Sequence, residues 1–202
     1  MATASGSWRD RLNRLSAQCP HPAWGPAHCQ RVYELARELA ALERTCVDAE
    51  ALFAAACLHD LGAMPPYRRT GVDHAERSAE LAVELLPGAG FARERIPLVR
   101  TIIRRHMYAD APSEPPEAVL FHDADTLDFL GAIGVARILS IVGLDDWAPD
   151  LPSAVQLLQR FQRELPDRLL CASARRMAAP RTAEMEAFLR ALGTETDAFA
   201  EL

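Results

Sequence analysis

The sequence contains no lysine, so every one of its 22 basic residues is an arginine. This absence excludes Schiff-base catalysis by a lysine and a phosphate-binding loop of the Walker type. The formal net charge of −6 also leaves no basic surface for extended nucleic acid or for an anionic membrane. A small phosphorylated ligand is still compatible with this composition, because a few arginines are enough to bind it.

Paired cysteine motifs and long apolar runs are absent as well. The 5 cysteines are odd in number and show no CxxC spacing, which favours a reduced, cytoplasmic setting. The N-terminal stretch "MATASGSWRDRLNRLSAQ" has no apolar signal core, and no later segment reaches the roughly 18 uninterrupted apolar residues of a membrane span. We therefore expect a cytoplasmic protein that does not enter a membrane.

Aromatic residues are few (6%), whereas alanine, leucine, glutamate and arginine are abundant, a composition that favours helices. Apolar residues recur every three or four positions, and no segment shows the alternation of a strand. Helices are predicted over residues 26–43, 48–62, 73–86, 93–108 and 117–143, the last interrupted around Gly131, with further helices after residue 150. The sequence thus predicts one all-α domain over residues 1–202.

The stretch "FAAACLHDLG" (residues 53–62) is apolar until it ends on two ionisable side chains, His59 and Asp60. Burying such groups is costly unless they are paired or bind a metal. His28 and Asp125 lie on neighbouring predicted helices and are candidate partners. Imidazole and carboxylate ligands suit divalent Fe, Mn, Co, Ni or Zn. A His-Asp dipeptide arises often by chance. Whether His59 and Asp60 bind a metal therefore has to be judged from the wider sequence pattern.

That pattern reads "HCQRV" at His28, "ACLHDLG" at His59 and Asp60, and "DADTLDFLGAIGVAR" at Asp125. It resembles the HD superfamily of metal-dependent phosphohydrolases, in particular the small bacterial single-domain members. The resemblance covers about residues 20–145 and leaves a helical C-terminal extension, residues 146–202. It implies an orthogonal helical bundle in which these four residues bind one divalent ion, with a second ion as an alternative.

Two further histidines match positions where this subgroup carries them: His74 in "DHAERSAELA" and His106 in "IIRRHM". Two interpretations stay open. The resemblance implies either that both bind a second ion bridged by Asp60, or that they contact substrate phosphate and transfer protons.

The remaining polar residues near these motifs have less defined roles. Asp128 lies three residues after Asp125 and either orients a ligand histidine or serves as an ordinary cap or arginine partner. His122 is expected at the surface or behind a ligand, and His21, between prolines, in solvent. Thr126 stands where the subgroup usually has a basic residue, which removes one expected phosphate contact.

Arginines are the only side chains left to neutralise a substrate phosphate. Arg68 follows the helix that carries the HD pair, and Arg104 precedes His106. We select these two, because most other arginines are expected in solvated faces or ion pairs.

The resemblance implies hydrolysis of a small phosphate ester, such as a nucleotide or related phosphomonoester. Asp60 would be both a metal ligand and the candidate general base, and either His74 or His106 would protonate the leaving group. One alternative is an HD-type diiron oxygenase that cleaves a C–C or C–P bond and uses all six ligands. Another is a nucleotide-binding regulatory module without turnover. The expected partner is a small phosphorylated substrate. The sequence leaves open whether the protein forms a homodimer.

Overall fold

The computed structural model describes residues 6–202, which contain helices and loops and no strand. The helices of eight or more residues are α1 (Trp8–Ala17), α2 (Pro26–Leu42), α3 (Ala49–Leu58), α4 (His74–Ala89), α5 (Ile96–Arg104), α6 (Pro116–Asp128), α7 (Gly131–Leu139), α8 (Leu151–Glu164) and α9 (Ala172–Glu195). Three short 3-10 helices are η1 (Leu61–Ala63), η2 (Arg93–Arg95) and η3 (Leu165–Arg168). The all-α prediction is confirmed. None of the helices within residues 6–202 has the length and apolar character needed to cross a bilayer.

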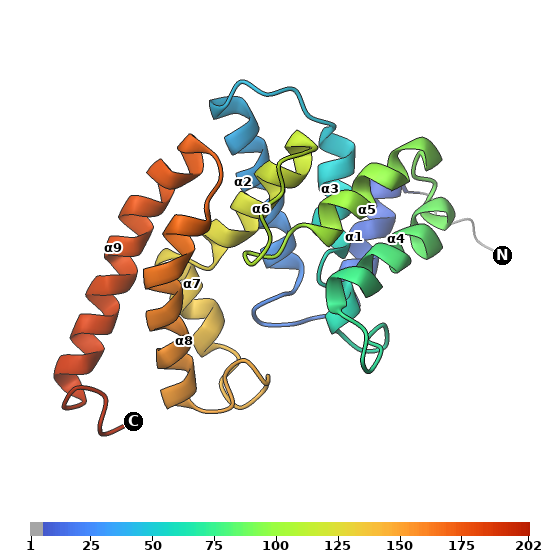
Figure 1. Cartoon of the computed structure of the whole chain (residues 1–202). Helices are drawn as coiled ribbons and strands as arrows, with labels where there is room; N and C mark the ends of the chain where they lie inside the picture. The colour runs from blue at the N-terminus through green and yellow to red at the C-terminus, as the bar shows by residue number, and fades with distance from the viewer. Residues whose placement is uncertain (1–5) are drawn as a thin grey trace.

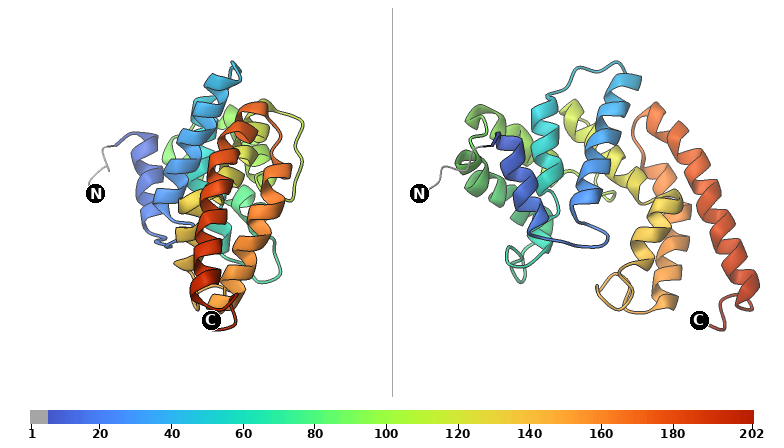
Figure 2. Two further views of the ribbon diagram at one scale, coloured as in Figure 1. Left: turned by 90° about the vertical axis from the view of Figure 1, so that its left-hand side faces the viewer. Right: turned by 180° about the vertical axis from the view of Figure 1, so that it is seen from behind.

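The helices form two groups on either side of a central pair (Figure 1). Helices α2 and α6 pack against each other in the middle, with α1, α3, α4 and α5 on one side and α7, α8 and α9 on the other. The view from behind shows the same arrangement (Figure 2). The N-terminal end of α2 lies next to the C-terminal part of α6, where Asp125 and Asp128 contact His28.

The observed helix boundaries depart from the predicted ones where the functional motifs lie. Helix α3 ends at Leu58 and α5 ends at Arg104, so His59 caps one helix and His106 lies beyond the other. Helix α1 was not predicted, although Ser7 and Asp10 form a capping box, which is a recognisable sequence signal. In contrast, the break before Gly131 lies where the sequence placed it.

Helix α3 is short and apolar, and its residues 51–58 are all buried. Four of these residues are alanines, whose small side chains let neighbouring helices approach closely. Asp48 accepts hydrogen bonds from the backbone N–H groups of Glu50 and Ala51 and so caps the helix at its start. Helix α3 therefore delivers the HD pair at its C-terminal end into the interior.

Gly62, just after the HD pair, allows the start of α4 to pack closely against η1. Its N–H donates to Ser78 Oγ at 2.8 Å. A β-carbon at residue 62 would overlap the backbone carbonyl oxygen of His74 and lie 2.8 Å from the backbone nitrogen of Ser78. Glycine is required here by the close approach of two backbones.

We predict that Gly62→Ala lowers the free energy of unfolding by about 2 kcal/mol, because the backbone of α4 must move away. Urea denaturation monitored by circular dichroism measures this change. Gly88→Ala is the matched control, since a β-carbon at residue 88 meets nothing within 4 Å and alanine favours the helix by up to about 1 kcal/mol. Equal effects of the two substitutions would contradict the close approach at residue 62.

Candidate metal centre

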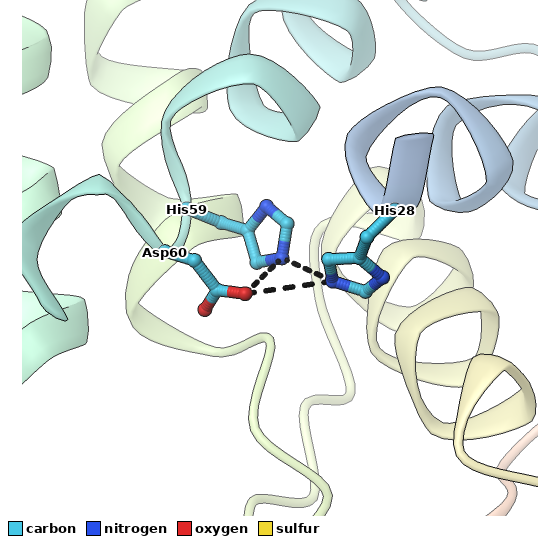
Figure 3. A group of neighbouring side chains, drawn as sticks. All are labelled: His28, His59 and Asp60. Atoms are coloured by element: carbon cyan, nitrogen blue, oxygen red, sulfur yellow. Dashed lines mark hydrogen bonds and ion pairs between the residues drawn. The ribbon is translucent and has the colours of Figure 1, made fainter. Parts of the chain in front are cut away.

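The four predicted ligands lie together although they come from three different helical regions. His28 is in the first turn of α2, His59 and Asp60 follow α3, and Asp125 is on α6. His28 Nε2 lies 3.1 Å from His59 Nε2, 3.5 Å from Asp60 Oδ2 and 3.3 Å from Asp125 Oδ1. Figure 3 shows His28, His59 and Asp60 pointing toward one another.

Two of the histidines are oriented by the ends of the helices that precede them. The last four carbonyl groups of a helix have no partner within it. His59 Nδ1 donates to the carbonyl of Ala56 in α3 at 3.0 Å, and His106 Nδ1 donates to the carbonyl of Ile103 in α5 at 2.6 Å. A carbonyl can only accept, so Nδ1 carries the proton and Nε2 faces the site, as in histidines that bind metals.

Asp128 orients the third histidine. Its Oδ2 accepts a hydrogen bond from His28 Nδ1 at 2.8 Å, which is the contact expected of an orienting carboxylate. Arg31 and Arg137 also donate to Asp128. Burial raises the pKa of Asp128, but the hydrogen bonds from His28 and Arg31 and the charge of Arg137 outweigh it, so the pKa is lowered. Asp128 is therefore ionised.

Arg137, on α7, is a site residue that the sequence reasoning missed. Its side chain is buried, donates to the carbonyls of Ala23 and Asp128 at 2.9 Å, and lies 3.3 Å from His28 Nε2. The guanidinium also stacks over Trp24 and Phe129, 4.7 and 4.6 Å from the ring centroids. The signal was present, because Arg137 ends the "GVAR" motif on an otherwise apolar helix.

The arrangement of these atoms fits a bound cation. The Nε2 atoms of His28 and His59 are too close for two lone pairs without a proton or cation between them. Asp125 Oδ1 is buried and, among residues 6–202, accepts no hydrogen bond, since His28 Nε2 at 3.3 Å is outside hydrogen-bonding geometry. Two ligands about 2.1 Å from one ion lie about 3.0 Å apart when they bind at right angles. The observed separations match this spacing.

A second cluster shares Asp60 with the first. Asp60 Oδ1 lies 3.7 Å from both His74 Nε2 and His106 Nε2, which are 3.4 Å apart. Its other oxygen, Oδ2, lies 3.2 Å from His59 Nε2. One carboxylate thus presents a different oxygen to each set of histidines. All six residues singled out in the sequence are therefore brought together. Three overlapping groups of them could hold a metal ion: His28, His59 and Asp60; His59, His106 and Asp125; and Asp60, His74 and His106.

The site holds an excess proton when no cation is bound. Burial and Arg137 would lower the pKa of His28, but the nearby carboxylates of Asp125, Asp128 and Asp60 raise it to about 9. Burial would also raise the pKa of Asp60, yet the surrounding histidines hold it well below its usual range. At neutral pH a cation must therefore displace the proton of His28.

The pKa values of the two remaining histidines move in opposite directions. Burial lowers the pKa of His74, which favours the neutral imidazole that a metal requires. Burial acts on His106 in the same way, but the nearby negative charges of Asp60 and Asp125 raise its pKa.

A cavity leads from the surface to this centre. Its lining is Trp24, Asp60, Ala63, His74, His106, Met107, Asp125, Phe129, Asp145 and Trp147. Arg68 lines an adjoining hollow that shares several of these residues. Arg104 lines neither, and its Nε donates to the carboxylate of Glu76 at 2.8 Å. Thr126 is fully buried, so its side chain does not face the cavity.

Two sequence expectations about histidines need correction. His122 is fully buried rather than at the surface, and its Nδ1 is 2.9 Å from Asp123 Oδ1, which also accepts from the backbone N–H of Leu170. His21 is not simply solvated: it stacks on Trp24, with ring centroids 5.8 Å apart, and its Nδ1 accepts from two backbone N–H groups. The direct partners of both histidines lie within three positions in the sequence, but no pattern used above indicates these contacts.

The helical core and the site residues match a known family. The family model of the HD domain matches residues 27–130, which is just over half of the chain. The chain belongs to the HD domain family. The matched segment begins at α2 and ends just after α6, so it contains all six residues around the centre. Comparison with the curated proteins gives no match.

Solved structures share the fold over most of the chain. A predicted HD superfamily hydrolase from an uncultured Thermotogales bacterium is 28% identical, with a TM-score of 0.62, and the match covers 93% of this chain and 90% of the other. Bacillus subtilis YpgQ in complex with ADP is 23% identical (TM-score 0.66; 93% and 97% covered). A Lactobacillus plantarum protein is 24% identical (TM-score 0.69; 98% and 100% covered). The fold therefore extends beyond the HD domain match into α7, α8 and α9.

The raised pKa of His28 predicts how the stability of the metal-free protein depends on pH. A group whose pKa is higher in the folded state stabilises it at pH values below its unfolded pKa, about 6.5, and loses that effect as pH rises through the folded value. We expect the free energy of unfolding to fall by about 3 kcal/mol between pH 6.5 and 9.5. Urea denaturation in the presence of a chelator measures it.

His28→Gln is the variant that isolates this effect. It keeps a polar side chain at position 28 but cannot take up the proton, so its stability should change less over the same pH interval. His21→Gln is the control, because burial lowers the pKa of His21 and places its titration below this interval. An unchanged slope in His28→Gln would contradict the assignment of the proton to His28.

Proposed function

We propose that this HD domain protein is a metal-dependent phosphohydrolase that cleaves a phosphate ester of a small molecule. The observation that carries the proposal is the carboxylate of Asp60, which faces His28 and His59 with one oxygen and His74 and His106 with the other. Shared carboxylates of this kind are suited to hold two divalent ions that act on one phosphoryl group. The HD domain match of this chain and its similarity to a predicted HD superfamily hydrolase support the same class of reaction.

In this proposal His28, His59, Asp60 and Asp125 hold one divalent transition metal, and Asp60, His74 and His106 hold a second. A divalent ion there supplies Lewis acidity and a nucleophilic water at neutral pH. The lowered pKa of Asp60 and its position between both clusters suit it to bind metal and to orient the attacking water. The lowered pKa of His74 favours a metal ligand over the acid that protonates the leaving group.

The proposed substrate is a small phosphorylated molecule, with nucleotides as the first class to examine. Arg68 is the one arginine among the residues that line the cavity and its adjoining hollow. It is exposed and makes no ion pair within residues 6–202, so its guanidinium is free to bind a phosphate. The structural relative YpgQ has been crystallised with ADP, which supports a nucleotide as ligand.

Metal analysis of single variants tests the two-cluster assignment. We expect Asp60→Ala to lose both ions and His74→Ala to lose one, because Asp60 belongs to both clusters and His74 to the second alone. Inductively coupled plasma mass spectrometry of the purified proteins gives the metal content. Hydrolysis of 4-nitrophenyl phosphate should fall at least roughly a hundredfold in Asp60→Ala.

His122→Gln provides the control for these variants, since His122 is buried beside Asp123 and belongs to neither cluster. It should keep the metal content of the natural protein. A single ion in the natural protein that His74→Ala retains would reject the second cluster while leaving the first intact. No phosphatase activity with any of the five metals would reject the proposed function.

Arg68→Gln tests the phosphate contact. We expect KM for a phosphomonoester to rise roughly tenfold, the equivalent of about 1.4 kcal/mol, because the variant loses a charged hydrogen bond to the substrate. Steady-state kinetics measures the change. Arg69→Gln is the matched control: Arg69 is adjacent in sequence but pairs with Glu80 and lines neither hollow. Equal values of KM in both variants would exclude Arg68 from binding.

A diiron oxygenase is the second candidate function. The convergence of four histidines and two aspartates on one region supplies the six ligands that such a centre requires. Iron content of two atoms per chain together with substrate-dependent O₂ consumption would favour it over hydrolysis. Hydrolysis under nitrogen at an unchanged rate would favour the phosphohydrolase.

A further inference from the structure

We propose that helix α8 carries a second ligand site, which binds the phosphate group of a small molecule separately from the metal centre. The site is a surface hollow of about 470 Å³, here called the α8 hollow, which is lined by Trp147 and by residues of α8. Helix α8 packs with α7 and α9 in the C-terminal group of helices (Figure 1). The inference does not rest on the proposed hydrolysis, because no candidate metal ligand lines this hollow.

The polar side chains that line the α8 hollow can all donate hydrogen bonds, and none of them is acidic. They are Ser153, Gln156, Gln159, Arg160 and Arg163. Within residues 6–202 none of these five side chains makes a hydrogen bond or an ion pair; the backbone N–H of Ser153 alone is used, in the cap of the helix. Two positive charges surrounded by free N–H groups favour an anion with several oxygen atoms, and a phosphate group is such an anion.

The positions of these residues along the helix place the donors together. Positions 156, 160 and 163 follow one another at four- and three-residue spacing, so their side chains lie on one face of α8. Arg160 and Arg163 are both exposed. Two like charges at this spacing repel each other and destabilise a helix. An anion bound between the two guanidinium groups would remove this repulsion.

No carboxylate of the chain neutralises this pair of arginines. Glu164 is the one acidic residue of α8, and it does not line the hollow. Exposed arginines elsewhere have such a partner: Arg69 pairs with Glu80, and Arg190 pairs with Glu186. The positive charge of the α8 hollow is therefore left for a ligand.

The guanidinium of Arg160 is held near an aromatic ring. Its central carbon lies 5.7 Å from the ring centroid of Phe161, which is a buried residue. A guanidinium over the face of a ring keeps the N–H groups at its edge free to donate. This contact restricts the side chain and lowers the cost of ordering it when an anion binds.

Trp147 is the boundary between the α8 hollow and the cavity at the metal centre. Within residues 6–202 it is the one residue that lines both spaces. Its ring stacks on Phe129, with centroids 5.9 Å apart and 18° between the planes. Because the two spaces share a single side chain, we assign the phosphate in the α8 hollow to a molecule other than the ligand of the metal centre.

Nuclear magnetic resonance of the 15N-labelled full chain tests this site. Inorganic phosphate is the probe, at low ionic strength and with a chelator present to remove metal ions. We expect saturable shifts of the backbone amide signals of residues 153–163 and of the side-chain Nε–H signals of Arg160 and Arg163. Because these guanidinium groups are near solvent, 0.5 M NaCl should weaken the binding by screening.

A double variant shows whether the two arginines form the site. Arg160→Gln combined with Arg163→Gln should raise the dissociation constant of phosphate at least roughly tenfold, because two charged donors are lost. The shifts are followed on the backbone amides of residues 153–157, which the variant does not alter. Both arginines are exposed, so we expect the fold to persist and circular dichroism to be unchanged.

Arg44→Gln combined with Arg93→Gln is the matched control. Both residues are exposed, make no ion pair within residues 6–202 and do not line the α8 hollow. The control removes the same total charge as the test variant. It should change the dissociation constant less than about twofold, because distant exposed charges are screened.

Three results would overturn the inference: no saturable shift in α8, shifts that persist in Arg160→Gln with Arg163→Gln, or equal weakening in the control, which would show an effect of net charge alone. If the double variant also weakened inhibition of the phosphatase by ADP tenfold, the hollow would serve the ligand of the metal centre, and the assignment to a separate molecule would be wrong. Absence of phosphatase activity would reject the proposed function but not this site, since the resonance experiment needs neither metal nor turnover.

Discussion

The half-buried carboxylate of Asp60 is the constraint on which the rest of the site depends. Four histidines place their Nε2 atoms within 3.2 to 3.7 Å of its two oxygens. Ring nitrogens and carboxylates brought this close need positive charge between them, either as protons or as a cation. In the metal-free protein a proton on His28, whose pKa is raised, supplies this positive charge. The spacing of the ligand atoms also fits a bound cation in its place.

The surrounding fold makes this arrangement rigid by using backbone groups that helices leave unpaired. Helices α3 and α5 each end just before a site histidine, and a carbonyl from the last turn accepts the Nδ1 proton. Asp128 serves His28 in the same way and is itself held by Arg31 and Arg137. The site is therefore oriented by two local contacts at helix ends and by the long-range contacts of Asp128 with α2.

The C-terminal part of the chain extends the helical fold and also supplies residues to the site. Helix α7 supplies Arg137, and the loop after it supplies Asp145 and Trp147 to the cavity. Asp123 on α6 accepts hydrogen bonds from the backbone N–H groups of Leu170 and Cys171, which fixes the segment before α9 against the central helices. Part of the cavity wall is thus supplied by residues outside the family's recognisable motifs.

The sequence by itself determined the all-α class, most of the helices and the six residues around the centre, because helical periodicity and short motifs are local properties. It did not determine the roles of Arg137 or Asp145, because each acts through a partner more than 100 positions away in the sequence. Helix ends were likewise decided by packing, and they set which ring nitrogen of His59 and His106 faces the site. Charge along the cavity depends on loops that only the folded chain brings together, and no sequence pattern records that proximity.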